Sequence, residues 1–222
     1  IIDELRWLGT QLGTTRDFDV FLEETLPPVI AAWPQHPGLT QVRDDIVARR
    51  DVASAASRAA VQSVRYQRLL LDIGAWLIAL FHPVSDTANG GSVKLAEFAN
   101  NALKRHRKQL IRRAHHLMEL SAEERHRVRI SGKRLRYAAE FFSPLFPAKR
   151  SKPYIQELAN LQTILGVLND AATTKSILSL IANEKGKDAQ AIVQTWVSGV
   201  THGHLAHLSQ AHARFLEQQK LW

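Results

Sequence analysis

The hydrophobic positions of the chain recur every three or four residues, which is the spacing of one face of an α-helix. We find no convincing alternation of apolar and polar residues of the kind that marks a half-buried strand. The pattern therefore predicts an all-α protein with long helices. We expect these helices over 1–13, from Thr15 or Asp17 to 26, and over 39–81, 93–119, 121–142, 154–165, 170–183 and 188–222.

Glycine and proline mark the boundaries that we expect. Gly13 and Gly166 are expected to end helices, and Pro27-Pro28 to stop the second one. The long helix over 39–81 contains Gly74, where we expect a bend. Loops are expected over 32–38, 82–91 and 143–153.

A ten-residue segment occurs twice, as LGTQLGTTRD (8–17) and LQTILGVLND (161–170). The matched residues include Leu8 with Leu161, Leu12 with Leu165, Gly13 with Gly166 and Asp17 with Asp170. We interpret the copies as parts of two similar helical halves, an incomplete one over 1–82 and one over 93–222, within a single domain. Chance similarity of two helix ends is the alternative. The basic helix that precedes the second copy would, for the first copy, fall before residue 1, so we expect N-terminal sequence to be missing.

Positive charge is concentrated in one part of the chain. The whole sequence carries a formal charge of +8, whereas residues 104–152 hold 15 lysines and arginines against four acidic residues, a net charge of +11. Such local charge favours a binding surface for an anion over a general effect on solubility. The absence of cysteine excludes disulfides and thiolate metal sites. The longest apolar stretch, 69–81, is too short to span a membrane, and we expect a cytoplasmic protein.

The segment HRVRISGKRLRYAAEFF (126–142) has two faces at helical spacing, and Ser121 and Glu124 form a capping box that begins its helix. The apolar face consists of Val128, Leu135, Ala139 and Phe142. The other face consists of His126, Arg129, Lys133, Arg136 and Glu140. Like charges at this spacing repel each other by a few tenths of a kcal/mol per pair. We therefore expect an anion to neutralise this face, and a solvated surface is the alternative.

Other cations extend the candidate site. A second line consists of Lys104, Lys108 and Arg112, and the helix over 39–81 adds Arg58 and Arg65. Arg16 lies in the first repeat, where Asn169 of the second repeat takes its place, so a cation is not required for folding there. We expect the remaining arginines of the basic segment to be solvated, namely Arg105, Arg113, Arg125 and Arg127.

Four motifs together resemble one known family. They are HRVRISGKRLRYAAEFF preceded by LKRHRKQLIRRA (103–114), LGTTRDFDVFLEETL (12–26), SVRYQRLLLDIGAWL (63–77) and LQTILGVLND. Their order and sequence resemble the CHAD family, the conserved-histidine α-helical domain. The resemblance implies two antiparallel four-helix bundles, a basic groove between them with His126 at the groove, and binding of inorganic polyphosphate. It also implies a CYTH-type triphosphatase domain as a fused partner, in the missing N-terminal part, and an association with polyphosphate or storage granules.

The residue types suit this ligand. Polyphosphate has regularly spaced charges and no base edges, so affinity must come from many lysine and arginine contacts with release of counterions. Arginine offers a planar fork for phosphate oxygens and lysine a compact charge. A histidine beside phosphate gains a proton more readily, so we expect binding to strengthen as pH falls.

We weigh two other functions. A nucleic-acid-binding module is compatible with the charge, but we see no helix-turn-helix, zinc finger or basic patch interleaved with aromatic residues. A phosphohydrolase would need a carboxylate cluster, for which Asp17, Asp19 and Asp170 are the candidates and helix capping the alternative. His204 and His207 have the spacing of a metal pair, although packing or solvation explains them more simply. We expect no enzyme activity and no cofactor.

Overall fold

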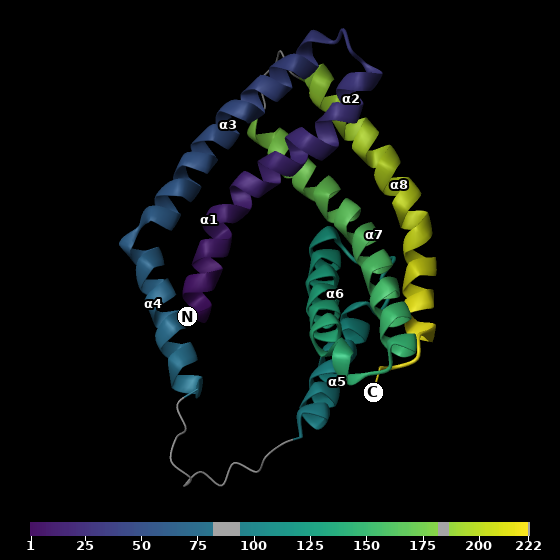
Figure 1. Cartoon of the computed structure of the whole chain (residues 1–222). Helices are drawn as coiled ribbons and strands as arrows, with labels where there is room; N and C mark the ends of the chain where they lie inside the picture. Colours follow the sequence, from purple (N-terminus) through teal and green to yellow (C-terminus); the bar gives the residue numbers. More distant parts are fainter. Residues whose placement is uncertain (82–93, 182–186, 222) are drawn as a thin grey trace. The chain divides into compact units, whose positions relative to one another are not determined.

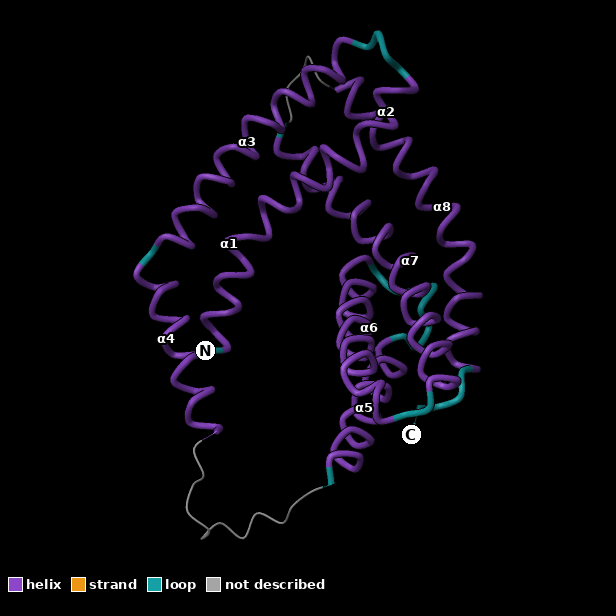
Figure 2. The backbone as a smooth tube through the Cα atoms, in the orientation of Figure 1, coloured by secondary structure: helices purple, strands orange, loops and turns teal. Residues whose placement is uncertain are grey.

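A computed structural model describes residues 1–81, 94–181 and 187–221, and every regular element in these ranges is helical (Figures 1 and 2). The prediction of an all-α protein is confirmed. The helices are α1 (Ile2–Val20), α2 (Leu26–Ala32), α3 (Pro37–Gln62), α4 (Val64–Phe81), α5 (Leu95–Arg113), α6 (Ala122–Phe142), α7 (Ala148–Leu180) and α8 (Lys187–Glu217). A π-helical turn (Phe21–Thr25) joins α1 to α2, and a 3-10 turn (Ser143–Leu145) follows α6.

Several predicted helix ends are wrong because glycine and proline do not stop these helices. Gly13 and Gly166 lie inside α1 and α7, and neither has the positive φ with which glycine ends a helix. Pro27 stands in the first turn of α2, directly after the π-helical turn. Likewise, α7 begins at Ala148 and includes Pro153. The expected loop over 82–91 lies outside the described residues.

The break in the helix predicted over 39–81 falls at Ser63 and not at Gly74. Ser63 has an extended backbone (φ −73°, ψ 151°). Its hydroxyl donates to the carbonyl of Ala60 at 2.6 Å and accepts from the N–H of Tyr66 at 3.2 Å. The side chain thus replaces helical backbone hydrogen bonds at the junction of α3 and α4.

The predicted capping box at the start of α6 is confirmed. The Oγ atom of Ser121 accepts from the backbone N–H of Glu124 at 3.2 Å, and the Glu124 carboxylate accepts from the N–H of Ser121 at 2.8 Å. These hydrogen bonds lower the pKa of Glu124. Two N–H groups that a helix start leaves unpaired are satisfied in this way.

The helices form two compact units. The first consists of residues 1–91 and 173–195, and the second of residues 92–172 and 196–222. The division differs from the expected halves, because residues 173–195 belong with the N-terminal part. Consequently α7 and α8 each contribute residues to both units.

The core of the second unit is built from α5, α6, α7 and α8. The predicted apolar face of α6 is confirmed, since Val128, Leu135, Ala139 and Phe142 are all buried. These residues pack with buried side chains of the other three helices, among them Leu103, Leu110, Leu158, Leu161, Leu165, Leu208 and Phe215. α6 is therefore fixed by its apolar face, which leaves its basic face available for other contacts.

The two copies of the repeat have different surroundings. Leu165 in α7 is 1% exposed, whereas its match Leu12 in α1 is 40% exposed. A Cβ atom placed on Gly166 would lie 4.0 Å from the Nε atom of Arg129, whereas one placed on Gly13 would meet no atom within 4 Å. α6 covers the second copy, and the matching face of the first copy is open.

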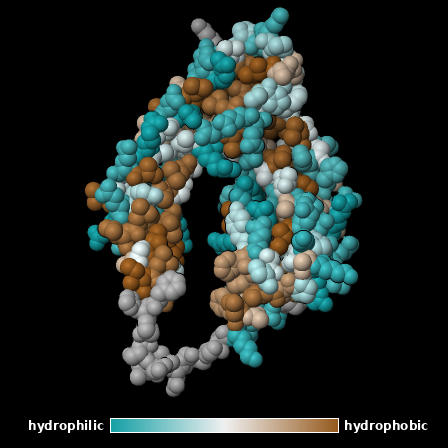
Figure 3. Space-filling view, in the orientation of Figure 1, coloured by the Kyte–Doolittle hydropathy of each residue, from teal (hydrophilic) through white to brown (hydrophobic). Residues whose placement is uncertain are grey.

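The first unit also leaves apolar side chains exposed on α4, where brown surface gathers in Figure 3. The exposed residues are Val64, Leu70, Leu71, Trp76, Leu77, Ile78 and Leu80. The buried apolar residues of this unit lie elsewhere, and they include Phe18, Phe21, Leu26, Val29, Leu39, Val42 and Ile46.

Candidate functional site

The predicted basic line on α6 lies beside α7 in the second unit. We call His126, Arg129, Lys133 and Arg136 the α6 line. The Nδ1 atom of His126 lies 2.5 Å from the Oδ1 atom of Asn169, which accepts the hydrogen bond. Asn169 in turn donates from Nδ2 to Asp170 at 3.3 Å. This chain of contacts orients the imidazole and assigns the Nδ1 proton to a protein partner, so Nε2 is the ring nitrogen left for a ligand.

The middle of the α6 line holds its cations close to α7. Arg129 is half-buried next to Gly166, and a Cβ atom placed on Gly166 would lie at an ordinary contact distance of 4.0 Å from its Nε atom. It forms no ion pair with any acidic residue that the structure describes. Lys133, one turn further on, is also half-buried. A half-buried arginine without an acidic neighbour is a suitable partner for a phosphate group.

The last member of the α6 line is already engaged within the protein. The Nε atom of Arg136 lies 3.7 Å from the Glu140 carboxylate, and its guanidinium lies 5.2 Å from the centre of the Tyr137 ring. Its charge is therefore partly offset before any ligand binds.

The residues of the second predicted line form part of the wall of a pocket beside α5. Lys104, Lys108 and Arg112 line a cavity of about 480 Å³ together with Arg107, Ile111 and Lys220, and we call these six residues the α5 pocket. No residue of α6 lines this cavity. That the lines on 104–112 and 126–136 belong to one groove stays a prediction.

The predicted cations of the first unit have local partners. Arg65 donates to the Glu4 carboxylate from Nε at 2.6 Å and from Nη2 at 3.1 Å, and it stacks over Trp7 at 4.1 Å. This hydrogen bond lowers the pKa of Glu4. Arg65 thus joins α4 to α1, and the Glu4 carboxylate neutralises its charge.

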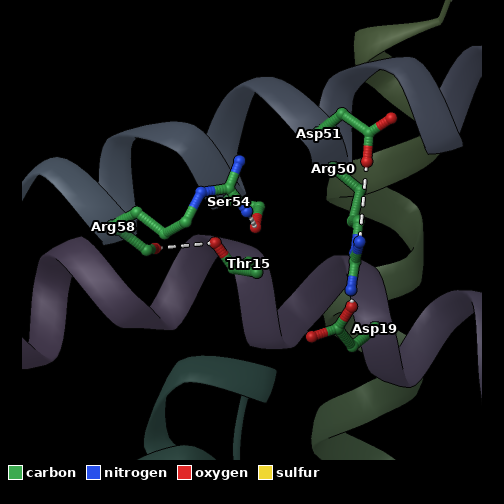
Figure 4. Close-up of polar contacts among 7 residues, drawn as sticks. Thr15, Asp19, Arg50, Asp51, Ser54 and Arg58 are labelled. Carbon is green, nitrogen blue, oxygen red and sulfur yellow. Dashed lines mark hydrogen bonds and ion pairs between the residues drawn. The ribbon is translucent and has the colours of Figure 1, made fainter.

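The other two predicted residues of this unit are exposed. Arg58 donates to the Oγ atom of Ser54 at 2.9 Å, as Figure 4 shows, and Arg16 lies on the surface of α1. Figure 4 also shows Arg50, which bonds to Asp19 at 2.8 Å and lies 3.5 Å from Asp51. Asp19, one of the carboxylates considered for hydrolysis, therefore pairs with a cation of its own unit.

Sequence reasoning missed several residues of these surfaces. Arg107 and Lys220 belong to the α5 pocket, and Asn169 holds His126. Arg107 is three residues from Lys104, a helical spacing that could have indicated it. The expectation that Arg113 is solvated is wrong, because its Nη1 atom donates to Ser131 at 2.7 Å. Arg125 also departs from that expectation, since it donates to the carbonyl of Leu120.

The described residues also bear on metal binding and on membranes. Within residues 1–81, 94–181 and 187–221, no three histidine, aspartate or glutamate side chains gather as a metal site would require. In the same ranges, no helix has the length and apolar character needed to cross a membrane.

Comparison with known proteins identifies the family. The family model of the CHAD domain matches residues 1–179 of the sequence. The chain belongs to the CHAD domain family. A crystal structure of the CHAD domain from the plant Ricinus communis is similar to this chain, with 30% sequence identity and a TM-score of 0.80 over 98% of this chain and 72% of that chain. No curated protein matches the sequence. The predicted resemblance to CHAD proteins is confirmed.

Proposed function

We propose that this CHAD domain binds inorganic polyphosphate without hydrolysing it, and that the α6 line is the primary contact surface. The observation that carries the proposal is the row of His126, Arg129 and Lys133 beside α7. There Arg129 is half-buried without an acidic partner among the described residues, and His126 is oriented by Asn169. Family membership supports the ligand, because the resemblance to CHAD proteins implies polyphosphate.

A row of cations along a helix suits a linear polyanion. Residues 126 to 136 span roughly 15 Å of helix, so several consecutive phosphates would each meet a cation. Long-range attraction from the basic segment 104–152 would add to these contacts. The proposal extends to a role beside a CYTH-type triphosphatase domain and at polyphosphate granules, as the family resemblance suggests.

The same residues give less support to the alternatives. Polyphosphate needs only cations, whereas a nucleic-acid site usually adds base contacts or aromatic stacking. Hydrolysis with metal ions would need clustered carboxylates. Of the considered acids, Asp19 pairs with Arg50, and Asp170 accepts from Asn169.

A binding titration with long-chain polyphosphate, repeated across a salt series, tests the proposal. Arg129→Glu and Lys133→Glu are each expected to weaken binding by about tenfold or more, the effect of losing one charged hydrogen bond. They should also make the salt dependence shallower. Lys175→Glu is the matched control, since this exposed lysine lies on the part of α7 that belongs to the first unit.

Two results would contradict the proposal. Equal affinity for duplex DNA and for polyphosphate at the same salt concentration would indicate a general polyanion surface. Release of phosphate from polyphosphate in the presence of magnesium would indicate catalysis. Circular dichroism of each variant checks that a loss of binding is not a loss of folding.

A further inference from the structure

The α5 pocket is distinct in shape from the α6 line. It is a cavity of about 480 Å³, which falls within the range of small-molecule sites. Five of its six lining residues are cations, and none is acidic. The sixth, Ile111, is half-buried and gives the cavity an apolar wall. The pocket is open to solvent, and five cations around it indicate an anionic ligand.

Three of the cations that line the α5 pocket have no interaction partner among the described residues. Lys104, Lys108 and Arg112 are exposed, and none forms a hydrogen bond or an ion pair with another described residue. They follow one another at intervals of four residues, so like charges repel along this face of α5. A bound anion would remove this repulsion.

The fourth cation is held in place. The Nη2 atom of Arg107 donates to the carbonyl of Leu216 at 3.3 Å, and its guanidinium lies 5.7 Å from the centre of the Phe215 ring. Both partners belong to α8. The guanidinium is thus oriented before a ligand arrives, which reduces the entropy that binding would cost.

The fifth cation comes from a distant part of the sequence. Lys220 follows α8 and lines the same cavity as the three exposed cations of α5. The pocket is therefore formed by the folded second unit and is not a property of the α5 sequence alone.

From this arrangement we propose a second anion-binding site, the α5 pocket, which takes a short chain of phosphates such as a triphosphate group. Lys104 to Arg112 spans roughly 12 Å of helix. A single phosphate would meet two neighbouring cations of this row, whereas three linked phosphates reach all of them. A triphosphate carries about four negative charges near neutral pH, which five cations can neutralise. Free inorganic triphosphate and the triphosphate of a nucleotide share this chemistry.

Isothermal titration with inorganic triphosphate, ATP, adenosine and orthophosphate tests the site. We expect triphosphate to bind at one site per chain, and orthophosphate and adenosine to bind at least tenfold more weakly. Tighter binding of ATP than of triphosphate would assign the site to nucleotides, and equal or weaker binding would assign it to inorganic triphosphate. Failure of both triphosphates to bind would overturn the proposal.

Variants separate this site from the proposed polyphosphate surface. Lys108→Gln, Arg112→Gln and Lys220→Gln are each expected to lower triphosphate affinity by about fivefold to tenfold. Arg129→Gln on the α6 line is the matched control and should change it by less than twofold. Because all three pocket side chains are exposed, we expect these variants to remain folded.

The affinity for long-chain polyphosphate should show the opposite pattern. It should fall strongly in Arg129→Gln and only slightly in Lys220→Gln. Equal losses of triphosphate affinity in Arg129→Gln and the pocket variants would merge the two surfaces into one and overturn the second site. If the unmodified protein binds triphosphate but not long-chain polyphosphate, the proposed function is contradicted. The proposal of a triphosphate site in the α5 pocket would still stand.

Discussion

Arg113 of α5 donates a hydrogen bond from its Nη1 atom to the Oγ atom of Ser131 on α6, across 2.7 Å. Ser131 is buried, and its hydroxyl donates to the carbonyl of Arg127 at 3.0 Å. A charged group thus satisfies a buried hydroxyl and joins the two helices. Arg113 therefore has a structural role within the basic segment.

We predict that Arg113→Ala lowers the free energy of unfolding by about 1 kcal/mol, because the hydroxyl of Ser131 loses a hydrogen bond. For a chain of this size the melting temperature should fall by about 2–4 °C. Thermal denaturation followed by circular dichroism measures both. Arg105→Ala, which removes an exposed arginine from the same helix, should change stability by less than about 0.5 kcal/mol. An equal loss in both variants would show that net charge is the cause.

The repeat offers a matched pair of leucines. Leu165→Ala should destabilise the protein by about 2–5 kcal/mol, because it leaves a cavity in the core of the second unit. Leu12→Ala should cost less than about 1 kcal/mol, since this side chain is 40% exposed. Urea denaturation gives both values. Similar losses would mean that the open face of α1 is covered in solution.

The capping box predicts a local effect at the start of α6. Ser121→Ala should cost about 1 kcal/mol and speed amide exchange in the first turn, because the N–H of Glu124 loses its acceptor. Hydrogen exchange followed by mass spectrometry measures the local change. Ser121→Thr keeps a hydroxyl and should restore most of the protection. Unchanged exchange in Ser121→Ala would contradict the role of the cap.

Two histidines predict a loss of stability in mild acid. Burial lowers the pKa of His212, and burial together with the charges of Arg105 and Arg134 lowers the pKa of His106. The unfolded chain therefore binds more protons than the folded chain near pH 6. Consequently, the free energy of unfolding should fall as pH drops through about 6.5 and towards the lowered folded values.

Denaturation at a series of pH values checks this dependence. His212→Gln and His106→Gln should each reduce the slope between neutral and mildly acidic pH. A slope of the opposite sign would mean that folding raises the pKa of these imidazoles.

Helical class and the α6 helix were predictable because both depend on local signals. The spacing of Val128, Leu135 and Ala139 marks the buried face, and the capping box marks the start. Helix ends were less predictable, because Gly13 and Gly166 lie in helices that tertiary packing stabilises in spite of a weak local preference.

The roles of individual cations depend on the fold. Arg65 and Arg113 look like other basic residues in the sequence, and only the folded chain brings them to Glu4 and Ser131. Lys220 lines the same pocket as the cations of α5, although it lies more than a hundred residues further along the sequence. No helical spacing could have predicted that placement.

The first unit is discontinuous in sequence, since residues 173–195 complete it after the whole 92–172 segment. During synthesis, this unit cannot assemble fully until residue 195 has left the ribosome. A single proteolytic cut or premature stop after α4 would likewise leave an N-terminal fragment without part of its own packing.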